Sequence, residues 1–424
     1  MPKTTALFLI SILFLINGYA QKEIKELVLQ NAVSLSEENA SEGFQKIGEA
    51  IGEAKIVFIG EQDHGDGSTF LIKADLIKYL HKHKGFNVIA FESDIYSVNY
   101  AWTEYKAGNI STDSAIKSSI YQVWTNCTQT SKTFEYIAQT QKNPNHISLT
   151  GFDNQLFFKI GLKNLAGDLI TYLSTKPIEF SKTSYYQQYF STDLDSLMKI
   201  FRYNNDNKAA KLVMLKKMKD ILSGIQGQLI SANLNADYHF LIIENCIAYC
   251  EQLIFTYEGN EYNSSAVRDK QMADNLTWLA THLFKDEKII VWAANSHIMN
   301  NSSSGLKKVF NKPPSMGSFI KFDPILGPQS FLLGFTGYTG EFGRATVNKT
   351  YKIQRPKLNS IETWLHEANY KKSFVNFRPL QTNKESFFMN CFNWRDYKAA
   401  WQNFFDGIIY LENTEPCTKV FRFK

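Results

Sequence analysis

The chain has 424 residues, a formal net charge of +5 at pH 7 and 44% hydrophobic residues. The charge is small and the Lys and Arg residues are scattered, so we expect no nucleic-acid partner. A chain of this length can bury a large core in one elaborate domain or in two. Five cysteines are too few for a disulfide framework of this size, so the core must hold the fold together.

Residues 1–20 have the pattern of a secretory signal peptide. Lys3 precedes an apolar run from Ala6 to Ile16, and Ala20 stands directly before a charged segment. A membrane anchor is the alternative, but the apolar run is shorter than the roughly 20 residues that a spanning helix needs. The pattern predicts cleavage near Ala20–Gln21 and a secreted or periplasmic protein without stable membrane insertion.

The remaining chain alternates short apolar runs with amphipathic segments. The runs predict buried strands, and apolar residues at steps of three and four predict helices. The expected strands are 55–60, 87–91, 146–151, 287–293, 329–338, 373–377 and 407–411, and the first expected helices are 70–80, 96–106 and 133–141. This order predicts an α/β domain over 21–424, with a mostly parallel central sheet flanked by helices. A helical lobe is expected as an insertion at about 156–283.

Polar groups follow each of the four best strands. In open α/β sheets, ligands bind at the carboxyl ends of the strands, so these groups form one candidate site. In chain order they are Glu61 and His64, Glu92, Asp153, and Asn295 with His297. Loops after strands are often polar, and Glu61 or Glu92 could instead cap helices. The helix that begins near residue 67 has Asp66 or Ser68 as its expected cap.

Several segments together resemble the erythromycin esterase family. Gly60-Glu61-Gln-Asp-His64-Gly65, followed by Glu92, is similar to the opening signature of that family. The other matching segments, in order, are 268–276, 292–297, 315–317 and 405–410. The resemblance extends from about residue 45 to residue 415.

The resemblance implies hydrolysis of a small-molecule ester or lactone by activated water, without metal or cofactor, in a monomer. His64 would be the general base, with Glu61 orienting its ring or holding the water. Glu92 would fix the tautomer of the imidazole. His297 would donate to the carbonyl oxygen or to the leaving alkoxide, and Arg268 would stabilise the oxyanion.

Lys73, Asp153 and Asn295 complete the predicted site as substrate contacts. Two positions depart from the family pattern. Ala294 stands where a histidine is usual, and Lys73 where an arginine is usual. Lysine keeps the charge but loses the planar fork of arginine. Macrolides therefore remain one substrate class among others.

Two other functions fit the same residues. Glu61, His64, Glu92 and His297 mix oxygen and nitrogen ligands suitable for zinc, which would make the protein a metal-dependent hydrolase. Alternatively, Ala294 and Lys73 mark a binding protein that has lost catalysis. Arg268 could also be a structural ion-pair partner rather than a catalytic group.

The cysteines suggest little chemistry. Cys246 and Cys250 lie four residues apart in an expected helix. We expect them to act as two small apolar residues on one face of that helix. An odd total leaves at least one thiol unpaired unless it links two chains.

Overall fold

The computed structural model describes residues 22–35, 40–201, 206–300 and 312–420. Within these ranges, nine strands form one sheet and two more form a separate hairpin. The expected signal peptide and its cleavage point lie outside the described residues. The segment 22–30, at the start of the first range, is helical.

Six strands form the parallel part of the sheet, in the order β11-β6-β2-β5-β3-β4. Their bounds are β2 Ile56–Ile59, β3 Phe86–Asp94, β4 Ser148–Asp153, β5 Lys288–Trp292, β6 Ser330–Phe342 and β11 Gly407–Thr414. Three antiparallel strands complete it, β8 (Lys372–Asn376), β1 (Ala32–Ser34) and β7 (Tyr351–Lys352), the last pairing with β6. The hairpin is β9 (Phe387–Phe392) with β10 (Arg395–Ala399).

The central strand β2 shows why its sequence is apolar throughout. Ile56 and Phe58 belong to the core cluster on one face of the sheet, and Val57 and Ile59 belong to the cluster on the other. All four are buried. A parallel strand covered on both faces has no solvent side, so every residue must be apolar.

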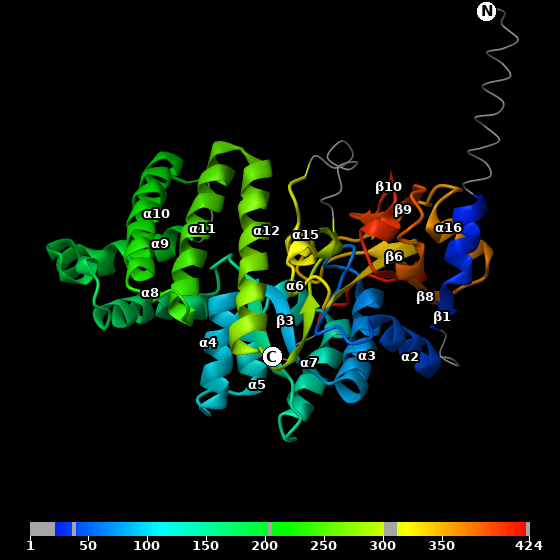
Figure 1. Cartoon of the computed structure of the whole chain (residues 1–424), viewed down its shortest axis with the longest axis horizontal. Coiled ribbons are helices and arrows are strands. Elements are labelled where there is room, and N and C mark those ends of the chain that lie inside the picture. Colours follow the sequence, from blue (N-terminus) through cyan, green and yellow to red (C-terminus); the bar gives the residue numbers. More distant parts are fainter. Residues whose placement is uncertain (1–21, 36–39, 202–205, 301–311, 421–424) are drawn as a thin grey trace, which may run out of the picture.

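Helices cover the sheet and also form a lobe beside it (Figure 1). Around the sheet are α2 Ala40–Ile51, α3 Gly67–Lys84, α4 Ile95–Lys106, α5 Thr112–Ser119, α6 Gln122–Thr125, α7 Thr128–Thr140, α13 Asn295–Ile298, α15 Met316–Phe322 and α16 Ile361–Glu367. The lobe contains α8 Lys159–Ser174, α9 Ser191–Ile200, α10 Lys208–Ser231, α11 Tyr238–Glu258 and α12 Glu261–Trp278. The lobe lies between β4 and β5 in the chain, and the mostly parallel α/β fold class is confirmed.

Helix α3, which carries the chain away from the first strand end, has a clear cap at each end. The Asp66 side chain accepts a hydrogen bond from the Thr69 N–H at 3.1 Å, as expected of an N-cap. Gly85 ends the helix in the left-handed conformation, with φ 72°, which glycine adopts without strain.

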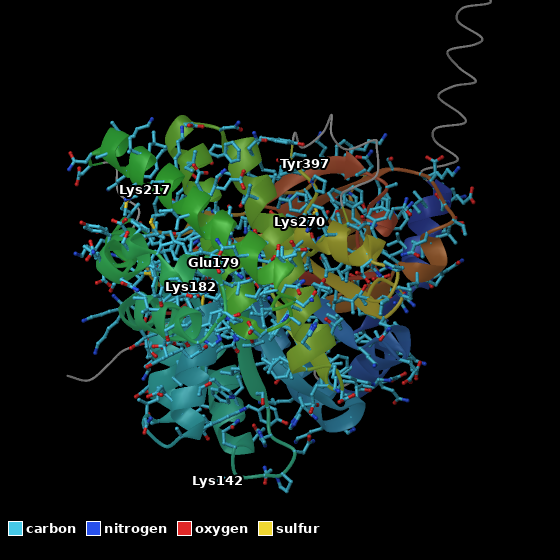
Figure 2. All side chains as sticks on the ribbon, turned by 60° about the vertical axis from the view of Figure 1, so that its left-hand side comes forward. Lys142, Glu179, Lys182, Lys217, Lys270 and Tyr397 are labelled. Carbon is cyan, nitrogen blue, oxygen red and sulfur yellow. A yellow bond between two sulfur atoms is a disulfide. The ribbon has the colours of Figure 1, made fainter. Side chains whose placement is uncertain are left out.

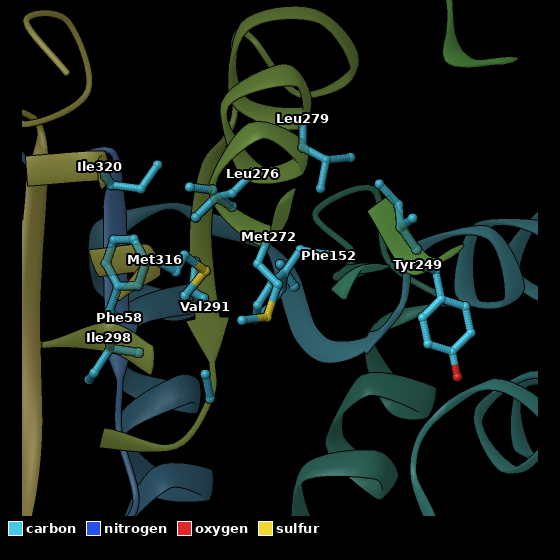
Figure 3. Packing of buried hydrophobic residues seen from close by; sticks show 14 of the residues in the cluster. Phe58, Phe152, Tyr249, Met272, Leu276, Leu279, Val291, Ile298, Met316 and Ile320 are labelled. Carbon is cyan, nitrogen blue, oxygen red and sulfur yellow. The ribbon is translucent and has the colours of Figure 1, made fainter. Parts of the chain in front are cut away.

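The lobe is joined to the sheet through α12. Figure 3 shows Met272 and Leu276 of α12 close to Val291 of β5, with Met316 of α15 beside them. Phe58 of β2 belongs to the same buried cluster. One continuous apolar core therefore extends from the sheet into the lobe.

Charged side chains lie on the outer surface of the lobe, and Figure 2 labels Glu179, Lys182 and Lys217 among them. Lys182 pairs with Glu179 at 2.8 Å, and Lys217 pairs with Asp193 at 2.7 Å. None of the helices in the described ranges has the length and apolar character needed to cross a bilayer.

The cysteines pair only in part. Cys127 and Cys417 form a disulfide, whereas Cys246, Cys250 and Cys391 are free and buried. Cys246 and Cys250 lie within the apolar core cluster, as the small apolar residues that their spacing predicted.

Candidate active site

The strand ends meet at a cavity of about 310 Å³. Its lining comes from the segments that follow β2, β5 and β6, from β3 and α12, and from the loops beside them. The lining residues are Gln62, Asp63, His64, Glu92, Tyr121, Val123, Trp124, Gln155, Arg268, Ala294, Ser296, His297, Arg344 and Asn393. His64, Glu92 and His297, which follow three of the predicted strands, thus lie in one cavity with Arg268 of α12, the residue suggested by the family resemblance.

Glu61 lies behind the cavity and is completely buried. One carboxylate oxygen is 3.0 Å from His64 Nδ1 and accepts a hydrogen bond from Trp124 Nε1 at 3.2 Å. The other oxygen forms an ion pair with Lys73. Because a carboxylate only accepts, the proton of neutral His64 lies on Nδ1, and Nε2 is left free to take a proton.

The His64 ring is held on a second side by Trp124. The two rings meet edge to face with centroids 5.1 Å apart. The His64 side chain is 21% exposed, whereas Trp124 is buried. A hydrogen bond and a ring contact together fix the orientation of the imidazole.

Lys73 lies beneath this cluster and is fully buried. Burial lowers the pKa of Lys73 to about 8, although the neighbouring carboxylate of Glu61 acts in the opposite direction. Its ammonium also lies 4.3 Å from the centre of a Trp292 ring. Lys73 therefore neutralises Glu61 from inside the protein. It has no exposed surface, so it does not contact substrate as the sequence suggested.

Asn295 is also structural in this arrangement. Its side-chain amide donates to the backbone oxygens of Phe335 at 2.7 Å and Cys391 at 2.9 Å, and its backbone N–H donates to the backbone oxygen of Glu61 at 2.8 Å. A Cβ on Gly60 would lie 2.0 Å from its amide oxygen, so only glycine fits there. Asn295 thus links three segments at the strand ends by hydrogen bonds. Its exposed fraction is 1%, so it is not the substrate contact that the sequence predicted.

A second cluster is centred on Arg268. Its guanidinium donates two hydrogen bonds to the carboxylate of Asp153, at 3.1 and 2.7 Å, and one to Glu92 at 2.9 Å. The other oxygen of Glu92 accepts the Ala294 N–H at 2.9 Å. Burial alone would raise the pKa of Glu92, but nearby His297, His64 and Arg268 outweigh it and hold the pKa at about 2. Glu92 is therefore an anion at any physiological pH.

These contacts change two of the roles expected from the sequence. Glu92 is bonded to Arg268 and Ala294, and it is Glu61 that bonds to the Nδ1 of His64 and sets its tautomer. Asp153 is fully buried and holds Arg268, so it does not face the substrate as predicted.

His297 lies between two carboxylates. Its Nδ1 is 2.8 Å from Asp269, and its Nε2 is 3.4 Å from Glu92 and 3.2 Å from Arg268. Arginine can only donate, so neutral His297 accepts from it, whereas protonated His297 donates to Glu92. Burial opposes the charged form, but Asp269 and Glu92 together raise the pKa of His297 above its ordinary value.

Asp269 and Arg344 are site residues that the sequence reasoning missed. Asp269 follows Arg268 directly and also accepts the Met316 N–H at 2.9 Å. Arg344 stands just beyond the end of β6 and is held by Asp63 through bonds of 3.1 and 2.7 Å. The signal for Arg344 was its place after a predicted strand, two residues past the last residue of β6.

A larger cavity of about 750 Å³ adjoins the first. Tyr121 and Gln155 line both cavities, so the two share a wall or an opening. The larger cavity extends to the lobe, where its lining is mainly aromatic and aliphatic: Phe157, Phe201, Tyr249 and Leu253, with Lys159, Gln252 and Thr256.

Within the described residues, no group of three or more His, Cys, Asp or Glu side chains is placed to hold a metal ion. The strongest candidates, Glu92 and His297, both have atoms in contact with the Arg268 guanidinium. A cation at this position would have to displace a fixed positive charge.

Comparison with known proteins identifies the family of the chain. The erythromycin esterase family profile matches residues 81–414. The chain belongs to the erythromycin esterase family. Membership in this family marks the chain as a hydrolase.

Two related proteins and one solved structure are similar to the chain over most of its length. "Putative hydrolase YbfO" of Bacillus subtilis (strain 168) is 26% identical over 385 residues, covering 85% of this chain and 84% of that protein. "Erythromycin esterase type II" of Escherichia coli is 22% identical over 405 residues, covering 89% and 94%. A crystal structure from Bacillus cereus has a TM-score of 0.68 at 18% identity, covering 94% and 99%, and shares the fold.

The buried pair of Glu61 and Lys73 leads to a stability prediction. Lys73→Met removes the buried ammonium that pairs with Glu61. The buried carboxylate of Glu61 is then left without its lysine partner. We expect a loss of about 3–5 kcal/mol in the free energy of unfolding at neutral pH. Urea denaturation of the variant and the wild type measures it.

The double variant Glu61→Gln/Lys73→Met is the matched control. It removes both charges, and the amide oxygen of Gln can still accept from Trp124. It should therefore recover part of the stability that Lys73→Met loses. A single variant that loses less than about 1 kcal/mol would show that the pair does not carry a buried charge.

Proposed function

We propose that this protein hydrolyses a carboxylic ester or lactone by means of water activated by His64. The observation that carries the proposal is the Glu61–His64 contact of 3.0 Å, in a cavity that also contains Arg268 and His297. Glu61 accepts a hydrogen bond from Nδ1–H, so Nε2 carries a free lone pair that can take a proton from water. Family membership supports hydrolysis, and the specific bond is our inference.

The reaction follows from the charges around the cavity. His64 Nε2 takes a proton from water as the water oxygen attacks the carbonyl carbon. Arg268, fixed by Asp153 and Glu92, stabilises the negative oxygen that develops. His297 supplies a proton to the departing alkoxide, because Asp269 and Glu92 help it to hold that proton.

Arg268 also supports chemistry without a metal. Its guanidinium already occupies the position beside Glu92 and His297 and provides the fixed positive charge that an oxyanion requires. Because the charge cannot be titrated away, it remains at any working pH.

The larger cavity suggests which esters are bound. Its volume of about 750 Å³ and its mainly aromatic and aliphatic lining suit the non-reacting part of a bulky, apolar substrate. Tyr121 and Gln155 would lie between that part and the ester group. Ala294 leaves the catalytic cavity wider than a larger side chain would.

The test is hydrolysis of a panel of macrolides, simple lactones and linear esters with small or bulky apolar groups, read by mass spectrometry. Wild type should add one water to bulky esters, with or without chelator. His64→Ala should reduce kcat/KM by about 10²–10⁴-fold, the usual contribution of a general base.

His146→Ala is the control, since His146 is exposed and lies outside the cavity. It should behave as wild type. Inhibition by chelator, with metal found by elemental analysis, would favour a metal-dependent hydrolase. A folded enzyme that turns over no ester would contradict the proposal and favour a binding protein.

The raised pKa of His297 predicts a change in pH dependence. His297 keeps its proton above its ordinary pKa of about 6.5, so activity should fall on the alkaline side when that proton is lost. Asp269→Asn removes one of the charges that raise the pKa. The alkaline limb of kcat/KM should therefore move to lower pH, while the acidic limb stays in place.

Asp274→Asn is the matched control for that measurement. Asp274 lies on the same helix but pairs with the exposed Lys270 at 2.6 Å. Its pH profile should equal that of wild type. An alkaline limb that does not move in Asp269→Asn would remove His297 from the acid role.

We also propose that the protein is exported and that it acts as a monomer. The disulfide between Cys127 and Cys417 supports an oxidising compartment. Expression of the whole chain with its own N-terminus should give a secreted or periplasmic product whose first residue is Gln21, by intact-mass measurement. A product that retains residues 1–20 would argue against a cleaved signal peptide.

A further inference from the structure

The C-terminal segment 415–420 lies against the loop that carries His64. Pro416 pairs with Asp66 in an antiparallel bridge, and the Gly67 N–H donates to the Glu415 oxygen at 2.9 Å. The first turn of α3, directly after the His64 loop, is thus hydrogen-bonded to a segment about 350 residues later in the chain.

The same segment is bonded to the turn between α6 and α7. The Thr128 N–H donates to the Thr418 oxygen at 2.7 Å, and the Val420 N–H donates to the Asn126 oxygen at 2.9 Å. This turn follows α6, which carries Trp124. Segment 415–420 therefore bridges the two elements that hold the His64 ring.

The disulfide lies at the centre of this bridge. Cys127 precedes α7 directly, and its Cα is 5.3 Å from that of Cys417. The backbone nitrogen of Cys417 lies 3.1 Å from the backbone oxygens of both Gly65 and Gly343. The sulfur of Cys417 is 4.0 Å from the backbone oxygen of His64. The disulfide thus joins the turn that follows Trp124 to a residue, Cys417, whose backbone is hydrogen-bonded to Gly65, next to His64.

The backbone is closely packed around this disulfide. A Cβ on Gly65 would lie 2.5 Å from the carbonyl carbon of Gly343 and 2.6 Å from the N of Arg344. The Gly343 N–H also donates to the Gly65 oxygen at 3.1 Å. The segment around Cys417 is therefore in close backbone contact with Gly65, the residue beside His64.

We propose that the Cys127–Cys417 disulfide is a positioning element for His64, and that it makes the hydrolase sensitive to thiol reductants. This inference rests on the proposed function of His64. A dithiol transfers two electrons and two protons to the disulfide, which becomes two thiols, and the dithiol itself becomes a disulfide. The released segment no longer holds Trp124 and the His64 loop together, so the base loses its orientation.

The chemistry of the cysteines makes the effect selective. Cys417 is partly exposed, so a reductant can reach the bond. The free cysteines are buried, and burial raises the pKa of each of their thiols, which keeps them unreactive. Alkylation after mild reduction should therefore label Cys417 before any other cysteine.

The experiment uses the full chain, oxidised or reduced with dithiothreitol and alkylated, with labelled sites mapped by mass spectrometry. Hydrogen exchange and ester hydrolysis are measured on both forms. We expect faster exchange confined to 62–68 and 122–128, and a fall in kcat of about 10–100-fold with little change in KM.

Two variants serve as controls. In Cys127→Ser/Cys417→Ser, activity should already be low and dithiothreitol should change nothing further. In Gln129→Ala, which removes a side-chain contact to Thr418 but keeps the disulfide, kcat should remain within about twofold of wild type.

Unchanged exchange at 62–68 in fully reduced, folded protein would overturn the proposal. Exchange that rises throughout the chain would also overturn it, because the disulfide would then act on global stability alone. If exchange changes locally but the oxidised protein hydrolyses no ester, the positioning role stands and the esterase proposal fails.

Discussion

A carboxylate with no access to water organises this molecule. Glu61 lies two residues after the end of the central strand β2, and three donors reach its carboxylate: Lys73, Trp124 and His64. A charge this deep is tolerated only when it is paired and hydrogen-bonded. Those partners come from α3, α6 and the His64 loop, so satisfying the charge also fixes the geometry of the site.

A second set of buried charged side chains lies beside Glu61 and its partners, and its charges are also paired. Glu92, Asp153 and Asp269 surround Arg268 and His297, and each cation contacts two anions. The two sets meet at one cavity but share no hydrogen bond between their side chains among those described. One set can hold a neutral base while the other holds positive charge, which is what ester hydrolysis requires of neighbouring groups.

Much of this arrangement was visible in the sequence. Strands buried on both faces read as continuous apolar runs, and the polar residues that follow them must meet at one edge of a parallel sheet. The strands that were not predicted are β1, β7, β9 and β10, which are short or lie at edges and in a hairpin. Such strands pair on one side only, and β10, Arg395-Asp-Tyr-Lys-Ala, has too few apolar residues to show a pattern.

The side-chain roles were harder to predict, and Lys73 shows why. It lies three residues after Phe70 and four before Ile77, on the apolar face of α3, so the helical period already placed it inside. Its position, where the family usually has an arginine, suggested a substrate contact instead. The Asp269–His297 contact depends on how α12 packs against α13, and the Cys127–Cys417 link spans 290 residues. Neither distance can be obtained from spacing alone.

The position of β5 has a consequence for how the protein folds. β5 fits between β2 and β3, and residues 56–59 pair with residues 289–292. The pairing closes a loop of more than 200 residues, which is slow because its entropy must be lost before any contact is gained. His64 and His297 can therefore become neighbours only after the lobe has been synthesised. Sequence changes at the lobe residues that line the larger cavity can alter its shape without changing the strand ends, as long as α12 keeps Arg268 and Asp269 in place.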